Sequence, residues 1–489
     1  MARPLKCRPW WSPPAKFPSV TLDLVLNGER VPLTADLLER YDVTGPRYTS
    51  YPTAPQWSDD FGPDDWADAL DASNRPAADG SARPLSLYMH LPYCRRMCLF
   101  CGCNVVIQSH PERAEPYLVT LKREIAAVAE RLDPARPVVQ FHWGGGTPTY
   151  FRPELLEDLF TFTRDRFNFA ADAEIGVELD PRVTTAEHLA MLHRLGFNRL
   201  SLGVQDFDPG VQAAVKRIQP YELVRDLMAA CRDLGFPDLN TDLIYGLPGQ
   251  TVASFATTLE QLIGLNPDRI ALFSYGHVPW VKRQQQALEG LIPLGLDKFQ
   301  LFRAGLAAFA AAGYRAIGLD HFARPDDELC RAQRDGTLHR NFQGYTTKAG
   351  ADLLGFGATA ISSLERTYAQ NFRGVPDYTA AVEADRLPTL RGLTLSEDDV
   401  IRRDVIMRLM CYEAIDQHAV EADHGITFDD YFAPELAALA PLEADGLVEL
   451  DAGVIRATPL GRVFVRNVAM PFDAYLSRPA NRPRYSRTI

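Results

Sequence analysis

The feature that most constrains the fold is a regular alternation of apolar runs and amphipathic stretches between residues 85 and 278. Strands buried on both faces produce near-continuous apolar runs, and strands that alternate with helices form parallel βα units. The alternation therefore predicts an α/β fold with six parallel strands. The predicted strands are 85–91, 138–143, 174–179, 199–204, 239–245 and 269–275, and the predicted helices are 115–131, 153–167, 185–195, 222–234 and 254–265.

Residues that can carry chemistry follow each of these apolar runs. Parallel βα folds gather their sites at the carboxyl ends of the strands. A closed eight-stranded barrel or an open doubly wound sheet also fits the alternation, but six strands that feed one site favour an incomplete barrel. In chain order the residues are a cysteine-rich loop, the glycines of 144–146 with Thr147, Glu178 and Asp180, Gln205 and Asp206, Asp242, and Tyr275 with His277.

The segments on either side of this core differ from it in composition. Residues 1–83 are rich in proline, and Asn27-Gly28 predicts a small hairpin. From about residue 395 the chain has mostly helical periodicity, with helices expected at 398–411 and at 431–444, the second interrupted or kinked at Pro441. A two-stranded turn is expected over 448–457. We therefore expect a separate, mainly helical C-terminal domain.

The cysteine-rich loop holds half of the chain's eight cysteines within ten residues, as Cys94, Cys98, Cys101 and Cys103. The first three have the spacing C-x-x-x-C-x-x-C, which suits a single iron–sulfur cluster bound by one loop. Three thiolates on a four-iron cluster leave one iron open to a substrate or cofactor, which indicates radical chemistry. A structural zinc site would need a second cysteine pair, and disulfides would need an oxidising compartment, so both alternatives are weaker.

Length and charge exclude several functional classes. At 489 residues the chain is too long for one ordinary core. The formal net charge of −12 argues against general nucleic-acid binding, and no apolar run is long enough to span a membrane. The first twenty residues lack the apolar core of a secretion signal. We expect a cytoplasmic enzyme.

Other motifs leave a functional and a structural interpretation open. The 144–149 loop lets a polar, zwitterionic ligand approach the backbone, or is a tight strand–helix turn. Glu178 and Asp242 either accept hydrogen bonds from the ribose hydroxyls of a ligand, or each is a helix cap or a surface charge. Arg217 binds a carboxylate or is solvated. The 355–360 segment resembles a dinucleotide fingerprint only superficially, so we expect packing there, with Ile361 lying against the site.

Two stretches combine arginine with aromatic residues outside regular elements, 45–53 and 320–345. Guanidinium groups bind carboxylates and aromatic rings stack on flat molecules, so an anionic, flat substrate would suit them. An ordinary contact between domains explains them equally well.

With these motifs in place, the chain resembles a known family. The cysteine spacing, with Phe100 before the third cysteine, is typical of the radical S-adenosylmethionine superfamily. Cys103 and four further segments narrow the resemblance to the oxygen-independent coproporphyrinogen III oxidases, also called coproporphyrinogen dehydrogenases. The segments are 45–53, 142–150, 203–207 and 320–328, and the similarity runs from about residue 37 to 484–487.

The resemblance implies an oxidoreductase of porphyrin and haem biosynthesis. A 4Fe-4S cluster on Cys94, Cys98 and Cys101 would bind S-adenosylmethionine, and a 5′-deoxyadenosyl radical would start oxidative decarboxylation of two propionates of coproporphyrinogen III. No residue is implied as an acid or base catalyst, and Cys103 is not a ligand. The resemblance places Tyr88, Gly145, Glu178 and Ile361 around the cluster-bound cofactor, and Phe100, Gly146, Thr147, Gln205, Arg217, Asp242 and Gly276 around a second S-adenosylmethionine molecule.

The resemblance also implies a domain plan and partners. Residues 1–36 are an extension without an assigned role, 37–83 contact substrate, 84–365 form a partial (βα)6 barrel of the radical S-adenosylmethionine type, and 366–489 form the mainly helical domain. A monomer that takes electrons from a donor such as flavodoxin or ferredoxin is expected. The alternatives are a haem chaperone, another porphyrin-acting radical S-adenosylmethionine enzyme, or a zinc-stabilised interaction protein.

Overall fold

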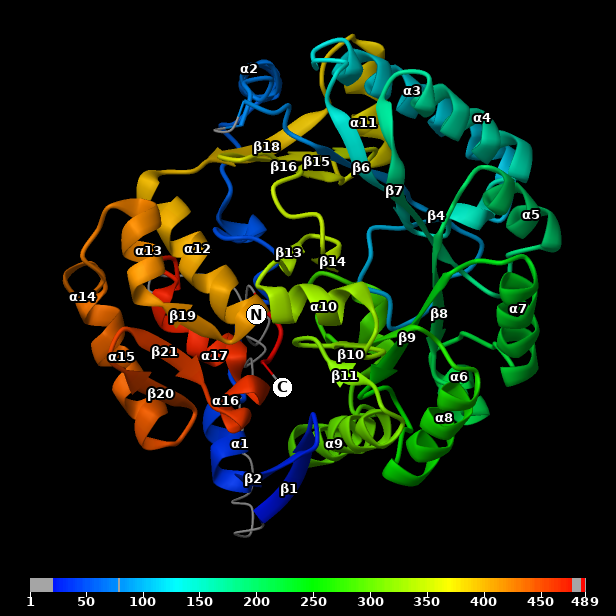
Figure 1. The fold of residues 1–489 in the computed structure, drawn as a ribbon. Coiled ribbons are helices and arrows are strands. Elements are labelled where there is room, and N and C mark those ends of the chain that lie inside the picture. Colours follow the sequence, from blue (N-terminus) through cyan, green and yellow to red (C-terminus); the bar gives the residue numbers. More distant parts are fainter. Residues whose placement is uncertain (1–20, 78–79, 477–484, 489) are drawn as a thin grey trace, which may run out of the picture.

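The core of the molecule is a curved sheet with helices on its outer side, as the computed structural model shows (Figure 1). The structure describes residues 21–77, 80–476 and 485–488. Within those residues the sheet has twelve strands, of which seven neighbours are parallel in the order β10-β9-β8-β7-β6-β3-β15. Six of the seven are the strands predicted from the apolar runs: β3 (Leu85–Leu91), β6 (Pro137–Gly145), β7 (Asn168–Leu179), β8 (Arg199–Gln205), β9 (Asp238–Tyr245) and β10 (Arg269–Ser274).

Helices follow these strands and cover the outer face of the sheet (Figure 1). Side-chain caps fix where some of them begin, since Thr185 accepts a hydrogen bond from His188 N and Thr251 accepts one from Ser254 N. The predicted partial (βα)6 barrel is therefore confirmed. The helices are α3 (Glu115–Ala129), α4 (Pro153–Arg164), α5 (Ala186–Arg194), α6 (Pro209–Ala214), α7 (Tyr221–Asp233), α8 (Val252–Gly264) and α9 (Gly295–Ala311).

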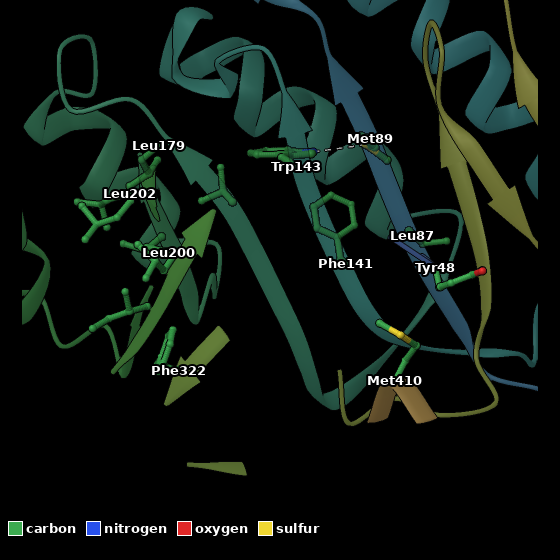
Figure 2. Packing of buried hydrophobic residues seen from close by; sticks show 14 of the residues in the cluster. Tyr48, Leu87, Met89, Phe141, Trp143, Leu179, Leu200, Leu202, Phe322 and Met410 are labelled. Carbon is green, nitrogen blue, oxygen red and sulfur yellow. Dashed lines mark hydrogen bonds between the residues drawn. The ribbon is translucent and has the colours of Figure 1, made fainter. Parts of the chain in front are cut away.

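The main core lies between the sheet and the outer helices. Alternate residues of a strand point to opposite faces, so Phe141 and Trp143 of β6 face α4 and leave the residues between them for the barrel interior. Phe141 and Trp143 are fully buried among Phe160 and Phe197, and the Trp143 indole donates to Met89 Sδ at 3.4 Å (Figure 2). This packing fixes which side chains face inward.

Both edges of the sheet carry strands that the sequence did not predict. β15 (Asp352–Phe356) is parallel to β3, and β16 (Ile361–Ser363), β17 (Thr367–Asn371) and β18 (Thr389–Thr394) continue antiparallel, with α11 (Val375–Glu383) between the last two. At the other edge β12 (His321–Ala323) is antiparallel to β10, and β11 (Arg315–Ala316) is antiparallel to β12. The boundary expected at residues 365 and 366 therefore falls inside this sheet.

The predicted hairpin at Asn27-Gly28 is confirmed as β1 (Thr21–Leu26) and β2 (Glu29–Thr34). Leu24 and Leu33 are fully buried, and Asn27 Oδ1 accepts a hydrogen bond from Ala316 N at 2.9 Å. The described part of the expected 1–36 extension is therefore packed onto the barrel, while residues 1–20 lie outside the described residues. The chain continues through α1 (Ala35–Tyr41), η1 (Ala54–Gln56) and α2 (Pro63–Ala72).

The mainly helical C-terminal region is also confirmed, and it packs beside the barrel (Figure 1). Pro441 lies inside α15, and the predicted hairpin is β20 and β21 with β19 added at its edge. No helix in the described part of the chain has the length and apolar character needed to cross a membrane. The elements are α12 (Glu397–Tyr412), β19 (Ala414–Asp416), α13 (Gln417–His424), α14 (Phe428–Tyr431), α15 (Ala433–Ala444), β20 (Val448–Asp451), β21 (Val454–Ala457), α16 (Pro459–Val463), α17 (Val465–Ala469) and η5 (Met470–Phe472).

Residues 43–45 pair with residues 486–488 at the end of the described chain. Gly45 N donates to Ser486 O at 3.1 Å, Thr488 N donates to Val43 O at 2.7 Å, and Thr44 forms a bridge with Arg487. Arg484, which belongs to the terminal motif of the resemblance, lies outside the described residues. The pairing ties the 45–53 segment to the last residues of the chain.

Candidate functional site

A cavity of about 520 Å³ runs through the barrel interior to the carboxyl ends of the strands. The structure brings all the predicted site residues except Tyr88 and Ile361 to its wall. The predicted residues that line the cavity are Cys94, Cys98, Cys101, Phe100, Gly145, Gly146, Thr147, Glu178, Gln205, Arg217, Asp242 and Gly276.

Backbone pairing holds the cysteine loop in place. β4 (Tyr93–Cys94) is parallel to β5 (Val106–Ile107), which closes the loop between them. Cys101 N donates to Cys98 O at 3.1 Å, and Leu99 N donates to Val215 O at 3.0 Å, which ties the loop to the end of α6. The thiols are therefore presented from one closed loop at the cavity wall.

Cationic and hydroxyl groups surround these thiols. Arg182 Nη2 lies 3.5 Å and Arg217 Nη1 3.7 Å from Cys98 Sγ, and Thr147 Oγ1 lies 3.3 Å from Cys94 Sγ. A hydrogen bond from Cys103 lowers the pKa of Cys101 to about 6, whereas burial raises the pKa of Cys94 to about 11. Guanidinium groups favour thiolates, the form that binds metal.

The donor set fits an iron–sulfur cluster. Among the described residues, no three His, Cys, Asp or Glu side chains close on a single metal ion. A four-iron cluster takes one thiolate at each of three corners, so its ligands do not meet at one point. Cys94, Cys98 and Cys101 supply three such thiols, while Cys103 is exposed.

The glycine loop is shaped by close packing on the side away from the cavity. Gly145 has φ +109°, and a Cβ there would lie 2.5 Å from the His90 ring. A Cβ at Gly146 would lie 2.6 Å from the Pro92 carbonyl carbon. These positions therefore require glycine for packing, and their free side lines the cavity.

Glu178 is held at the same point by the end of β6. Gly145 N donates to Glu178 Oε2 at 3.0 Å, and His142 Nε2 lies 3.8 Å from Oε1. Burial pushes the pKa of Glu178 upward, but His142 and the Gly145 N–H outweigh it, and the pKa lies below its usual value. Glu178 is therefore an ionised acceptor facing the cavity.

A second carboxylate, Asp180, joins the cluster region to the arginines. Arg217 Nη1 lies 3.3 Å and Arg182 Nη2 2.6 Å from Asp180 Oδ2, and Arg217 Nη2 donates to Gly203 O at 2.7 Å. Burial opposes ionisation, yet the two arginines lower the pKa of Asp180 to about 2. Sequence reasoning missed Arg182, although its place two residues after Asp180 at a strand end was a usable signal.

Inward positions of β8 and β9 extend the polar wall. Asp242 contacts Asn240 Nδ2 at 3.0 Å and Ser201 Oγ at 3.4 Å. Burial, with the charge of Glu178, raises the pKa of Asp242 to about 7. Ser201 and Asn240 were missed, and their signal was the period of two in these strands, which sets polar residues on the inner face.

Several buried polar atoms in the cavity wall have no hydrogen-bond partner among the described residues. Buried polar groups in native proteins are nearly always paired, so unpaired ones at a cavity wall indicate a ligand. The atoms are Gln205 Oε1, Arg217 Nε, Arg199 Nε, His321 Nδ1 and Gln343 Nε2.

The two arginine and aromatic stretches meet beside this cavity, and only the second contributes residues to its wall. Arg47 forms an ion pair with Asp320, and Arg340 Nη2 contacts Arg47 O at 3.4 Å. The Arg340 guanidinium lies 4.6 Å from the centre of the Tyr345 ring, and Tyr345 lines the cavity beside His321. Segments almost three hundred residues apart therefore form one cluster of arginine and aromatic side chains, of which His321 and Tyr345 line the cavity. Asn341 and Tyr345 belong to a hairpin of β13 (His339–Asn341) and β14 (Gly344–Thr346), which follows α10 (Glu328–Asp335).

Comparison with known proteins identifies the family. The Radical SAM superfamily model matches residues 88–262, and the HemN C-terminal domain model matches residues 395–464. The oxygen-independent coproporphyrinogen III oxidase of Synechocystis sp. is 44% identical over 94% of this chain and 98% of its own length. The enzyme of the same name from Escherichia coli is 45% identical over 93% of this chain and 98% of its own length.

A solved structure agrees with these relatives. It is described as coproporphyrinogen III oxidase (HemN) from Escherichia coli, a radical SAM enzyme, and it superimposes with a TM-score of 0.84 at 45% identity, covering 88% of this chain and 97% of that chain. The chain belongs to the family of oxygen-independent coproporphyrinogen III oxidases.

In this oxidase chain, Tyr88 and Ile361 are the two predicted site residues that do not line the cavity, and their surroundings differ. Tyr88 stacks on His142, which does line the cavity, with ring centres 6.2 Å apart, and its hydroxyl lies 3.1 Å from His90 Nδ1. The Ile361 side chain packs instead against the group of Trp57, Tyr368 and Leu395.

The packing expected for 355–360 is observed in this coproporphyrinogen oxidase fold. Gly357 has φ +96°, and a Cβ there would lie 2.4 Å from Tyr117 Oη. Ala358 N donates to the same hydroxyl at 2.9 Å. The segment thus closes β15 onto α3.

Proposed function

We propose that this protein converts two propionate side chains of coproporphyrinogen III to vinyl groups without oxygen, giving protoporphyrinogen IX in haem biosynthesis. The observation that carries the proposal is one cavity whose wall holds the three cluster cysteines, several carboxylates and arginines, and the aromatic rings of His321 and Tyr345. It occurs in a chain that is 42–46% identical to curated oxidases of this name. Each turnover removes from a propionate a hydrogen atom, which the 5′-deoxyadenosyl radical takes, carbon dioxide, and one further electron, which passes to an oxidised one-electron acceptor.

Cys94, Cys98 and Cys101 hold a 4Fe-4S cluster in this proposal. When bound, the cluster and S-adenosylmethionine supply the one-electron chemistry that abstracts a hydrogen atom from the β-carbon of a propionate. Arg182 and Arg217 offset the negative charge of the thiolates, since both lie near Cys98 Sγ. Cys103 is left free of iron, and no side chain acts as an acid or base catalyst.

The carboxylates and backbone of the cavity wall position S-adenosylmethionine. Glu178 accepts hydrogen bonds from ribose hydroxyls, as an ionised carboxylate with room on its cavity side can. Tyr88 and Gly145 belong to the same subsite. Ile361 rests on the family resemblance alone, because its side chain packs on the Trp57 side of β16.

A second S-adenosylmethionine molecule occupies the remaining inner wall. Gln205 Oε1 and Arg217 Nε, both without a partner in the protein, are available to bind it, and Asp242 faces the same space. Phe100, Gly146, Thr147 and Gly276 complete this subsite. Related enzymes usually have alanine at position 276, and a Cβ there would meet no atom within 4 Å, so the glycine leaves the wall intact.

Arg47 and Arg340 bind the carboxylates of coproporphyrinogen III, and Tyr345 and His321 face its rings. The support is that His321 and Tyr345 line the cavity, and that the Arg340 guanidinium, with two nitrogens unpaired among the described residues, lies behind Tyr345 and next to Arg47. In this reading residues 37–83 contact substrate, 84–365 carry the chemistry, and 366–489 help exclude water. The protein works as a cytoplasmic monomer that receives electrons from a carrier such as flavodoxin or ferredoxin.

Anaerobic turnover tests the proposal. The reconstituted protein is incubated with coproporphyrinogen III, S-adenosylmethionine and dithionite, and carbon dioxide and vinyl products are measured. Release of two molecules of carbon dioxide per protoporphyrinogen IX is expected. Stable haem binding with no decarboxylation would identify a chaperone instead, and methyl transfer to a porphyrin would identify another radical enzyme.

A further inference from the structure

A second cavity, of about 770 Å³, lies on the outer side of the cysteine loop. The two cavities share part of their lining, namely Cys94, Arg96, Met97, Thr147, Asp180 and Arg182. The cysteine loop is therefore a wall between two spaces, and the inner space is the one that holds the proposed ligands. Cys94 is only half-buried, so the cluster region can be approached from outside without opening the substrate cavity.

The outer cavity is basic in a chain that is acidic overall. Arg95, Arg96, Arg182 and Lys216 line it, against one carboxylate, Asp180, which is already paired with Arg182 and Arg217. The formal net charge of the whole chain is −12. A local cationic excess beside the cysteines is thus opposite in sign to the molecule as a whole, and it favours an anionic partner.

Exposed apolar side chains lie within this basic region. Ile218 is 59% and Leu223 38% exposed, and both line the outer cavity. Lys216 has φ +56°, and the turn that contains it is fixed by the hydrogen bonds of Lys216 N to Ala213 O and Arg217 N to Gln212 O. Exposed apolar side chains beside charged ones on an ordered backbone are typical of a protein–protein interface.

We propose that this surface, made of Arg95, Arg96, Arg182, Lys216, Ile218 and Leu223, docks an acidic protein that carries one electron on a low-potential flavin or iron–sulfur group. The inference rests on the proposed function, which requires an electron at the cluster. One electron passes from the reduced carrier to the oxidised cluster, so the carrier is oxidised and the cluster reduced. No bond is made or broken at the surface and no proton is transferred there.

The test compares two reductants on the reconstituted holoenzyme. Arg95→Glu with Lys216→Glu reverses two charges at residues that line only the outer cavity. With reduced flavodoxin as donor, we expect the decarboxylation rate at low flavodoxin concentration to fall at least about tenfold, because like charges now face each other. With dithionite, which needs no docking, the rate should stay within about twofold of the unmodified protein.

The matched control reverses two exposed charges elsewhere, Arg386→Glu after α11 and Arg456→Glu on β21. This variant changes the net charge equally, so it should keep flavodoxin-driven activity if the surface rather than total charge decides docking. Raising salt from about 50 to about 300 mM should slow the flavodoxin reaction of the unmodified protein and leave that of the docking variant nearly unchanged.

Two results would overturn the docking surface. One is flavodoxin-driven activity within about twofold of normal in the Arg95 and Lys216 variant, and the other is an equal loss in the Arg386 and Arg456 control. Neither bears on the proposed function, which fails separately if the unmodified protein gives no decarboxylation with dithionite.

Discussion

Buried polar side chains occur in two contrasting regions of this molecule. Between α3 and the β15 edge of the sheet, Glu124 accepts hydrogen bonds from Tyr378 Oη at 2.6 Å, Gly357 N at 2.7 Å and Asn371 Nδ2 at 2.6 Å. Nearby, Arg136 has a partner for every guanidinium nitrogen, including Asp352 at 2.5 Å. In the cavity wall, by contrast, Gln205, Arg217 and His321 each keep an unpaired buried atom.

The contrast separates groups that stabilise the fold from groups that wait for a ligand. A satisfied network is expensive to disturb, because removing one member leaves the others buried without partners. In the cavity wall, some buried polar atoms already lack hydrogen-bond partners in the folded protein, so removing such a group leaves no new atom unpaired. Substitutions in the first region should therefore lower stability, and substitutions in the second should lower ligand binding.

The largest expected effect is the loss of the cluster. Cys98→Ser should remove nearly all iron from the anaerobically reconstituted protein, which should otherwise hold about four irons per chain, and should abolish turnover. The measurement is iron content together with decarboxylation. Cys103→Ser is the control, and loss of iron in that variant would contradict the assignment of three ligands.

Glu124→Ala tests the satisfied network. It leaves three donors buried without an acceptor, so we expect the free energy of unfolding to fall by about 3–5 kcal/mol. Denaturant unfolding measures the change, and Tyr378→Phe, which removes one donor, should cost only about 1 kcal/mol. A small effect of Glu124→Ala would mean that the network does not act as a unit.

Gln205→Ala tests the unsatisfied wall. Its Oε1 has no partner in the part of the chain that the structure describes, so stability should change by no more than about 0.5 kcal/mol. Binding of S-adenosylmethionine should weaken about tenfold, since one hydrogen bond is worth about 1.4 kcal/mol here. Titration calorimetry on the reconstituted protein checks the affinity, and the opposite pattern, lost stability with unchanged affinity, would break the contrast.

The smallest expected effect depends on pH. The pKa of Asp242 is about 7 in the folded protein, raised by burial and by Glu178, against an ordinary value of 3.8. The pKa of Asp242 is higher in the folded protein than in the unfolded one, so protonation of Asp242 stabilises the fold. This stabilisation is complete below about pH 4 and is lost as the pH rises through about 7. The free energy of unfolding should therefore fall less with rising pH in Asp242→Asn, by about 1–2 kcal/mol after allowance for water in the cavity.

Denaturation of the ligand-free protein at about pH 4.5 and about pH 7.5 measures this difference. Asp172→Asn, at an exposed carboxylate of β7, is the control and should leave the pH dependence of the parent protein unchanged. An unaltered decline in the Asp242 variant would show that another group is responsible.

The sequence predicted the fold best where burial on two faces makes a strand apolar. All six core strands were found for that reason, with ends within a few residues except at β7, which begins earlier, at Asn168. β16 is only three residues long, Ile-Ser-Ser, and its partners are set by the tertiary structure, so no local pattern identified the β15–β18 edge. For the same reason a boundary at 365 looked natural in the sequence.

The candidate site was predicted mainly from residues that follow strands. Glu178, Gln205 and the cysteines reached one cavity because parallel strands end at one edge. Ile361 could not be placed this way, since its orientation depends on β16. Arg340 and Arg47 were noted as suitable for an anion, but only the folded chain shows that they meet.

The pairing of residues 43–45 with 486–488 has a consequence for biosynthesis. During synthesis residues 43–53 and the six βα units emerge well before residues 486–488, and domains generally fold as they leave the ribosome. Residues 43–45, which lead into the segment with Arg47, cannot pair with residues 486–488 until the end of the chain is released from the ribosome. The barrel can therefore fold before this pairing forms, and the segment that carries Arg47 is fixed in place only after synthesis has ended.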